Sequence, residues 1–287
     1  METRQLEYFV AVAEELSFTR AAQRLLTGQS TVSAGVRALE SELDTALFER
    51  STRRVALTPA GVSLLPEAKA ALNAIDRARL SVRLPDSGLH GRLRIATTGC
   101  RAVDLPKTVA VFKERHPQVD VRLTVSAGNS LGLVEEVKIG SLDLAMVDLP
   151  RSELGGLVTR VIQQRPYVVV LPPGHRYADR AELSLMDLKD EDFVDAPRGF
   201  GSRMVIDRAY DALDVRRNVV AEVADLRLAE SYVDAGIGVA VAPDACVSEG
   251  MVVRPIAGAE LSWSLSVVAL RLSPAVRAVL AVLEEHS

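Results

Sequence analysis

A row of short hydrogen-bonding side chains begins the most informative helical pattern in this 287-residue chain. Gln29, Ser30, Thr31 and Ser33 stand at its start, and Arg37 follows one turn after Ser33. Small polar groups at a helix N-terminus can donate to and accept from base edges in the major groove of DNA, which is about 12 Å wide and admits one helix. These residues therefore predict the reading of base pairs by hydrogen bonds.

Apolar residues indicate how the polar row is positioned. Val32, Val36, Leu39 and Leu43 recur at spacings of four, three and four, so we expect them to face inward together. A shorter helical pattern that begins after Ser17 precedes them, separated by a turn that contains a glycine. The pair predicts a helix-turn-helix, with an ordinary helical hairpin as the alternative.

Flanking segments complete this predicted domain. A third apolar stripe upstream would let three helices share one core, and the alternating segment 51–57 predicts a β-hairpin wing. Paired arginines near the tip of that wing are expected to contact phosphates. The predicted DNA-contacting residues are Thr19, Arg20, Arg24, Gln29, Ser30, Thr31, Ser33, Arg37, Arg53 and Arg54.

The net charge of the chain and the positions of its charged residues indicate how it would bind DNA. A formal net charge of −4 is not that of a protein that coats nucleic acid nonspecifically. The arginines lie in and beside the predicted reader, whereas acidic residues such as Glu14 and Glu15 lie near helix ends and are expected to face away. We therefore expect a narrow basic strip that touches a few phosphates per subunit.

Residues 59–86 predict a long linker helix, with Thr58 as its N-cap and Pro59 at its first position. Apolar residues at spacings of four and three form a coiled-coil seam, which predicts a homodimer or homotetramer. The alternative is a helix that lies on its own domain. The predicted seam residues are Leu64, Ala68, Ala71, Ile75, Ala78 and Val82.

Strands and helices alternate from residue 87 to 287, which predicts two α/β lobes with a cleft between them. The predicted strands are 92–96, 119–125, 142–147, 167–171, 219–223, 239–242 and 265–270, and the predicted helices between them include 105–115, 130–139, 226–235 and one opened by the segment 199–203. Ligands of such sheets bind beyond the carboxyl ends of strands, where helix N-termini offer free N–H groups. Hydroxyls and helix ends together favour a small organic anion as the effector. The predicted effector-binding residues are Thr97, Thr98, Cys100, Ser126, Asn129, Ser130, Asp148, Gly201, Ser202 and Arg203.

Short motifs occur along almost the whole chain. The reader and wing contain 6–9 (LEYF), 17–22 (SFTRAA), 47–50 (LFER) and 57–61 (LTPAG), and the remainder contains 91–95 (GRLRI), 112–117 (FKERHP), 140–145 (GSLDLA) and 236–243 (GIGVAVAP). In their order and spacing these motifs resemble those of LysR-type transcriptional regulators. Two positions depart from the family pattern: Gly28 replaces the usual Ser or Thr cap, and Ala34 stands where many members carry arginine.

The resemblance implies a multidomain α and α/β protein. We expect a winged helix-turn-helix at 1–58, a linker and dimerisation helix at 59–86, and a two-lobed, periplasmic-binding-protein-like effector domain at 87–287. Lobe I would comprise about 91–163 and 266–287, and lobe II about 164–265. The implied function is sequence-specific binding of double-stranded DNA, modulated by a small-molecule effector.

Three alternatives remain open at this point. Gly128-Asn129-Ser130-Leu131-Gly132 matches the motif of a serine hydrolase, although no suitably placed histidine follows Ser130. A redox-sensing regulator would use Cys100, although Cys246 is predicted in the other lobe. A solute-binding module would use the N-terminal helices for assembly alone.

The sequence also indicates which cofactors and cellular locations are not expected. We find no Cys-x-x-Cys spacing and no apolar run approaching the roughly 20 residues of a membrane span, so we expect no metal, no cofactor and no membrane association. The acidic start does not match a signal peptide, which favours a cytoplasmic location. No enzymatic activity is expected.

Overall fold

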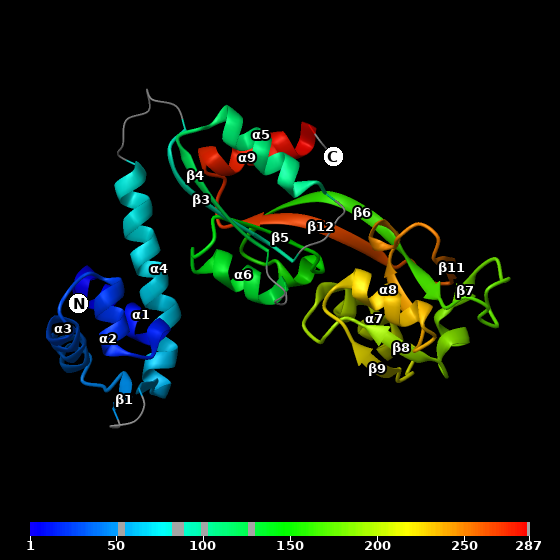
Figure 1. The fold of residues 1–287 in the computed structure, drawn as a ribbon, viewed down its shortest axis with the longest axis horizontal. Coiled ribbons are helices and arrows are strands. Elements are labelled where there is room, and N and C mark those ends of the chain that lie inside the picture. The colour runs from blue at the N-terminus through cyan, green and yellow to red at the C-terminus, as the bar shows by residue number, and fades with distance from the viewer. Residues whose placement is uncertain (51–54, 82–88, 99–102, 126–129, 286–287) are drawn as a thin grey trace. The chain divides into compact units, whose positions relative to one another are not determined.

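The computed structural model describes residues 1–50, 55–81, 89–98, 103–125 and 130–285 (Figure 1). The chain divides into two compact units, residues 1–87 with 139–141, and residues 88–138 with 142–287. Each unit has its own hydrophobic core.

The first unit contains the predicted helix-turn-helix and wing. Its elements are α1 (Thr3–Glu15), α2 (Phe18–Arg24), α3 (Gln29–Glu42), β1 (Phe48–Arg50), β2 (Val55–Leu57) and α4 (Pro59–Ser81). Strands β1 and β2 pair antiparallel, as a hairpin requires. The Ser17 hydroxyl caps α2 by accepting from the backbone N–H of Arg20 at 3.3 Å, which explains why α2 begins where it does.

The inward stripe of α3 forms the centre of this core. Val32, Val36 and Leu39 are fully buried, together with Phe9 of α1. The prediction for Leu43 was wrong, because this residue follows the last turn of α3 as its C-cap and is 39% exposed. A residue beyond the last helical turn no longer follows the helical periodicity, so its spacing does not predict which way its side chain faces.

The linker helix α4 begins at the predicted cap. The Thr58 hydroxyl accepts from the backbone N–H of Gly61 at 3.0 Å, and Pro59 is the first helical residue. Its apolar stripe, however, covers the core of its own domain: Ala68 is 1% exposed, and Leu64 and Ala71 pack against the same core. The burial of Ala68 within the monomer corrects its assignment to a dimer seam, whereas Leu64 and Ala71 are only half-buried and stay predicted seam residues. The predicted seam residue Val82 lies outside the described residues.

The second unit is built on a mixed sheet in the order β4-β3-β5-β12-β6-β11-β7, with β10 also paired to β6. Its strands are β3 (Gly91–Thr97), β4 (Val119–Val125), β5 (Leu144–Val147), β6 (Val158–Leu171), β7 (Leu183–Ser184), β10 (Ala240–Pro243), β11 (Val252–Ala257) and β12 (Ser262–Ala269). A separate parallel pair joins β8 (Asp192–Asp195) to β9 (Asn218–Glu222).

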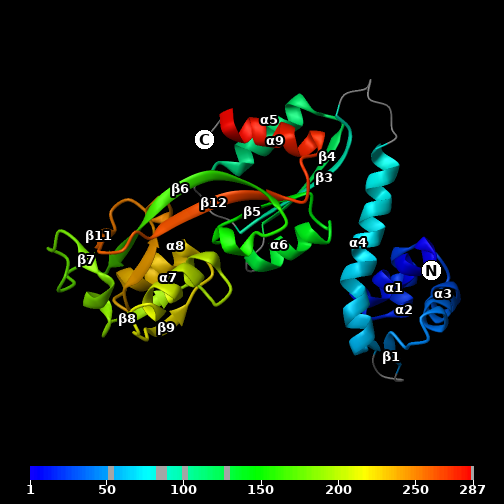
Figure 2. The same ribbon diagram turned by 180° about the vertical axis from the view of Figure 1, so that it is seen from behind.

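Helices cover both faces of β3, β4 and β5 (Figures 1 and 2). Alternate residues of β5 divide between two cores, because Leu144 and Met146 pack with α5 (Leu105–Arg115) and α9 (Pro274–Glu285), whereas Ala145 and Val147 pack with α6 (Ser130–Lys138). We call this part, with β3–β5, α5, α6 and α9, lobe I. Lobe II contains β7–β11 with α7 (Gly201–Asp211) and α8 (Leu226–Asp234).

Two long antiparallel strands, β6 and β12, run through both lobes. Their register extends from Ser262 opposite Pro166 to Ala269 opposite Val158, with a shift between Leu265 and Ser266. The sequence predicted only 167–171 of β6, and it did not predict β8 or β11. Most side chains in the first half of β6 are exposed or half-buried. This part of the strand therefore lacks the alternating apolar pattern by which a strand is predicted.

Within the described residues, no helix is both long and apolar enough to cross a membrane. The same part of the chain contains no group of three or more histidine, cysteine, aspartate or glutamate side chains that could hold a metal ion.

Candidate nucleic-acid interface and effector site

Helix α3 presents the predicted polar row on its outward face. Gln29, Ser30, Thr31 and Arg37 are exposed, and Ser33 is half-buried. The fully buried Val32, Val36 and Leu39 fix this orientation from the opposite side of the helix. The hydrogen-bonding groups of the first turn are therefore available to a partner outside the protein.

The close approach of α1 fixes the position of α3. A Cβ atom on Gly35 would lie 2.3 Å from the ring of Tyr8, so only glycine lets α1 and α3 pack as they do. On the other side of α3, Glu40 accepts from the backbone N–H groups of Leu47 at 2.9 Å and Phe48 at 3.3 Å, which anchors the start of the wing. The predicted wing residues Arg53 and Arg54 lie outside the described residues.

The predicted basic residues of α2 have acidic partners. Arg24 contacts Glu14 at 2.6 Å and Glu15 at 3.6 Å, and Arg20 lies 3.5 Å from Glu15 and donates to its backbone carbonyl. The expectation that Glu14 and Glu15 face away was wrong, because the last turn of α1 meets α2 in the folded domain. Thr19, also on α2, is exposed.

Glu14 also contacts α4. Its carboxylate lies 2.7 Å from Lys69 Nζ, so one acidic side chain joins α2 to the linker helix. Burial raises the pKa of Glu14, but hydrogen bonds from Lys69 and Arg24 outweigh that effect and lower the pKa below its usual value. The Arg24 side chain is therefore exposed, while its positive charge is compensated by Glu14.

A groove of about 650 Å³ runs between the start of α1 and α3. Ser30 and Thr31 line one side of it and Arg4 the other. Arg4 is 65% exposed, its Nε donates to the Tyr8 hydroxyl at 3.1 Å, and its nearest carboxylate, Glu7, is 3.9 Å away. Sequence reasoning missed Arg4, because only the packing of α1 on α3 brings it beside the predicted reading face.

Three of the predicted effector residues meet where lobe I touches lobe II. The Ser130 hydroxyl, at the start of α6, donates to Asp148 Oδ1 at 2.6 Å. Gly201, the first residue of α7, lies so close that an added Cβ would be 2.1 Å from the Asp148 backbone oxygen and 3.0 Å from Oδ1. The Asp148 carboxylate therefore lies at two helix N-termini, whose partial positive charge it can neutralise.

A further polar group near Asp148 was not predicted. Tyr167 in β6 is 2% exposed, and its buried hydroxyl has no hydrogen-bond partner in the described structure. Burial raises the pKa of Tyr167 above its usual value, and the negative charges of Asp148 and Asp195 raise it further. The sequence signalled a buried strand at this position and gave no sign of an unsatisfied hydroxyl.

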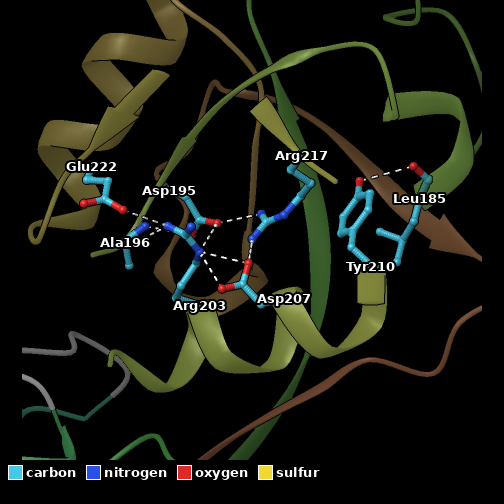
Figure 3. A network of polar contacts seen from close by, with 8 residues as sticks. All are labelled: Leu185, Asp195, Ala196, Arg203, Asp207, Tyr210, Arg217 and Glu222. Carbon is cyan, nitrogen blue, oxygen red and sulfur yellow. Dashed lines mark hydrogen bonds and ion pairs between the residues drawn. The ribbon is translucent and has the colours of Figure 1, made fainter. Parts of the chain in front are cut away.

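Arg203 is held by a buried network (Figure 3). It donates to both oxygens of Asp207 at 2.9 Å, to the backbone oxygen of Ala196 at 2.9 Å and to Glu222 at 3.3 Å. A second buried arginine, Arg217, donates to Asp195 at 2.6 Å and also contacts Asp207. Arg203 is thus committed to the framework of lobe II, and its charge is compensated without a ligand.

The other predicted effector residues divide into two groups. Thr97 and Ser202 are buried and Thr98 is half-buried, at the end of β3 and the start of α7. Cys100, Ser126 and Asn129 lie outside the described residues, so their positions are untested.

Neither enzymatic nor redox chemistry gains support from this geometry. Ser130 is fully buried and donates to a carboxylate, whereas a hydrolase nucleophile needs an exposed hydroxyl and a base that accepts its proton. His175 lies beside Glu191 at 3.5 Å, in a different cluster. Cys246 lies in a short turn after β10, and no second cysteine is described near it.

Comparisons with known proteins agree with these two units. Residues 3–62 match a family described as "Bacterial regulatory helix-turn-helix protein, lysR family", and residues 86–287 match "LysR substrate binding domain". The regulator ShiR of Corynebacterium glutamicum is 37% identical over 245 residues, which cover 84% of this chain and 82% of ShiR. The Escherichia coli activator HcaR is 32% identical, with 100% and 98% of the two chains covered. A full-length OxyR variant from Pseudomonas aeruginosa has the same fold, with a TM-score of 0.73, 24% identity and coverage of 100% and 97%.

Proposed function

Because this chain belongs to the LysR family of DNA-binding transcriptional regulators, we propose that the first turns of α3 read the operator and that a small molecule binds beside Asp148 to regulate it. Membership of this family indicates the general function, which is that of a transcriptional regulator that self-associates. The residue assignments are our own. We propose a cytoplasmic location for the protein, because its DNA target lies there.

The exposure of Ser30 and Thr31 above a fully buried stripe is the observation that carries the DNA-reading proposal. The N-terminal residues of a recognition helix contact base edges. Gln29 and Ser33 flank these two, and Arg37 extends the same exposed face by two turns. Arg20 and Arg24 are proposed as phosphate contacts that exchange a glutamate partner for DNA.

The double variant Ser30→Ala/Thr31→Ala is expected to bind its operator about 10- to 100-fold more weakly, because each lost hydrogen bond removes about 1 kcal/mol of specific binding. The probe is the duplex that the wild-type protein selects from a randomised pool, titrated by fluorescence anisotropy. Ser41→Ala, an exposed change near the end of the same helix, should leave the affinity unchanged. Equal losses for both variants, or none for either, would contradict the assignment.

Arg4 is proposed as an additional phosphate contact, because it is exposed, weakly paired and shares a groove with Ser30 and Thr31. Arg4→Met should lower affinity similarly for all sequences and reduce the slope of log affinity against log salt by about 0.9 per subunit, the value for one phosphate. Arg122→Met, which changes an exposed arginine of the effector domain, is the control. An unchanged slope for Arg4→Met would remove Arg4 from the interface.

The effector is proposed to bind through Thr98, Ser130, Asp148 and the Tyr167 hydroxyl, with Gly201 and Ser202 of α7 closing from lobe II. Because Asp148 already neutralises two helix ends, we favour a neutral or hydrogen-bond-donating molecule over the small organic anion expected from the sequence. Such a ligand changes DNA affinity only through its differential affinity for two arrangements of the protein.

Ile75 and Ala78, which do not belong to the domain core, remain proposed contacts between subunits.

A further inference from the structure

Ala34 stands at the centre of the face that α3 turns away from its core. With 3.6 residues per turn, it lies about 160° around the helix from both Val32 and Val36, which are fully buried. Ser30 precedes it by one turn and Arg37 follows by three residues, so all three share the outward face. Ala34 is therefore placed to enter a groove that α3 occupies.

The surroundings leave the Ala34 methyl group uncovered. Tyr8 packs against the neighbouring Gly35, so α1 covers the flank of α3 and leaves its outermost line free. Ala34 itself is exposed, and it lines the open groove shared by α1 and α3. A methyl group in this position can make apolar contacts with DNA but no hydrogen bond.

In the major groove, only thymine presents a methyl group, and alanine is among the side chains that contact it. On the basis of the proposed role of α3, we propose that Ala34 is a specificity-determining residue that packs against the 5-methyl group of a thymine. Ser30 and Arg37 on either side would supply the polar contacts to neighbouring bases. The α3 helix would therefore prefer a thymine at the base step that faces Ala34.

The test removes one methyl group at a time from each partner. In the duplex that the wild-type protein selects, each thymine is replaced in turn by deoxyuridine, which lacks only the 5-methyl group. One position per half-site should then lose affinity about fourfold, the factor to which the ~0.8 kcal/mol of one buried methyl group converts. Ala34→Gly should lose affinity for the thymine duplex and be insensitive to deoxyuridine at that same position.

Ala38→Gly is the matched control, because it makes the same change on an exposed position of the same helix one turn further along. It should keep the fourfold preference for thymine. If Ala34→Gly unfolds, Ala34→Ser provides a second variant, because serine keeps the Cβ atom and favours a helix more than glycine does but replaces apolar methyl surface with a hydroxyl group. Its thymine preference should fall below that of Ala38→Gly.

The outcomes separate this inference from the proposed function. Selection of no duplex at all would overturn the role of α3 in reading DNA. Selection of a duplex whose thymines can all be replaced by deoxyuridine without loss, or a thymine preference that Ala34→Gly and Ala34→Ser both retain, would overturn the inference about Ala34 alone.

Discussion

Asp195→Ala is expected to lower the free energy of unfolding of the effector domain by about 3–5 kcal/mol, the cost of leaving a buried charge without its partner. The side chains of Asp195, Arg203 and Arg217 are 7%, 6% and 3% exposed. Asp195 Oδ2 lies 2.6 Å from Arg217 and 3.6 Å from Arg203, so its removal leaves both guanidinium groups short of negative charge inside lobe II (Figure 3).

Urea unfolding followed by tryptophan fluorescence measures this effect. The only tryptophan, Trp263, lies 2% exposed in β12, so it reports on the effector domain. Asp211→Ala, an exposed change on the same helix as Arg203, should stay within about 0.5 kcal/mol of the wild type. The double variant Asp195→Ala/Arg217→Met should recover part of the loss, because it also removes an unpaired charge. A loss for Asp195→Ala no larger than that for Asp211→Ala would show that the network is not needed for stability.

Gly201→Ala is expected to separate the start of α7 from Asp148. The new Cβ atom would lie 2.1 Å from the Asp148 backbone oxygen and 2.6 Å from its carbonyl carbon, and neither backbone atom can yield as a side chain would. Such overpacking costs about 1–3 kcal/mol, and relief by movement of α7 would break the contact between the lobes. We therefore expect lower stability together with faster amide hydrogen exchange in the first turn of α7.

Gly155→Ala is the matched control for this change, because nothing lies within 4 Å of its added Cβ atom. It should alter neither the urea midpoint nor hydrogen exchange at α7. The Gly201→Ala protein should also respond less in a thermal-shift screen of small polyols, amines and carboxylic acids, since the proposed effector site includes this contact. Wild-type exchange rates in the first turn of α7 would disprove the close approach of Gly201 to Asp148.

Helix α3 shows what a local pattern can predict. The spacing of Val32, Val36 and Leu39 indicated which face of α3 is buried, and the polar residues opposite them are exposed as expected, except for the half-buried Ser33. Thr58 and Pro59 likewise marked the start of α4, because capping depends on residues only three positions apart. Such features follow from the geometry of a single helix.

The partners of these faces were less predictable. The sequence showed an apolar stripe on α4 but not that Ala68 lies under its own domain, and it showed arginines on α2 but not that Glu14 and Glu15 reach them. It placed Arg203 at a helix start, yet the acidic groups that surround it come from β8, β9 and α7. Tyr167 appeared only as part of a buried strand.

The sequence by itself determined the family, the order of the domains and the outward face of the reader, because these depend on periodicity and on motifs a few residues long. Only the tertiary structure decided which charges are already paired, which apolar surface of α4 is covered and how Ser130, Asp148 and Gly201 meet. Many of those contacts join residues from 10 to more than 50 positions apart. No local pattern specifies them, since burial and charge pairing are properties of the packed chain.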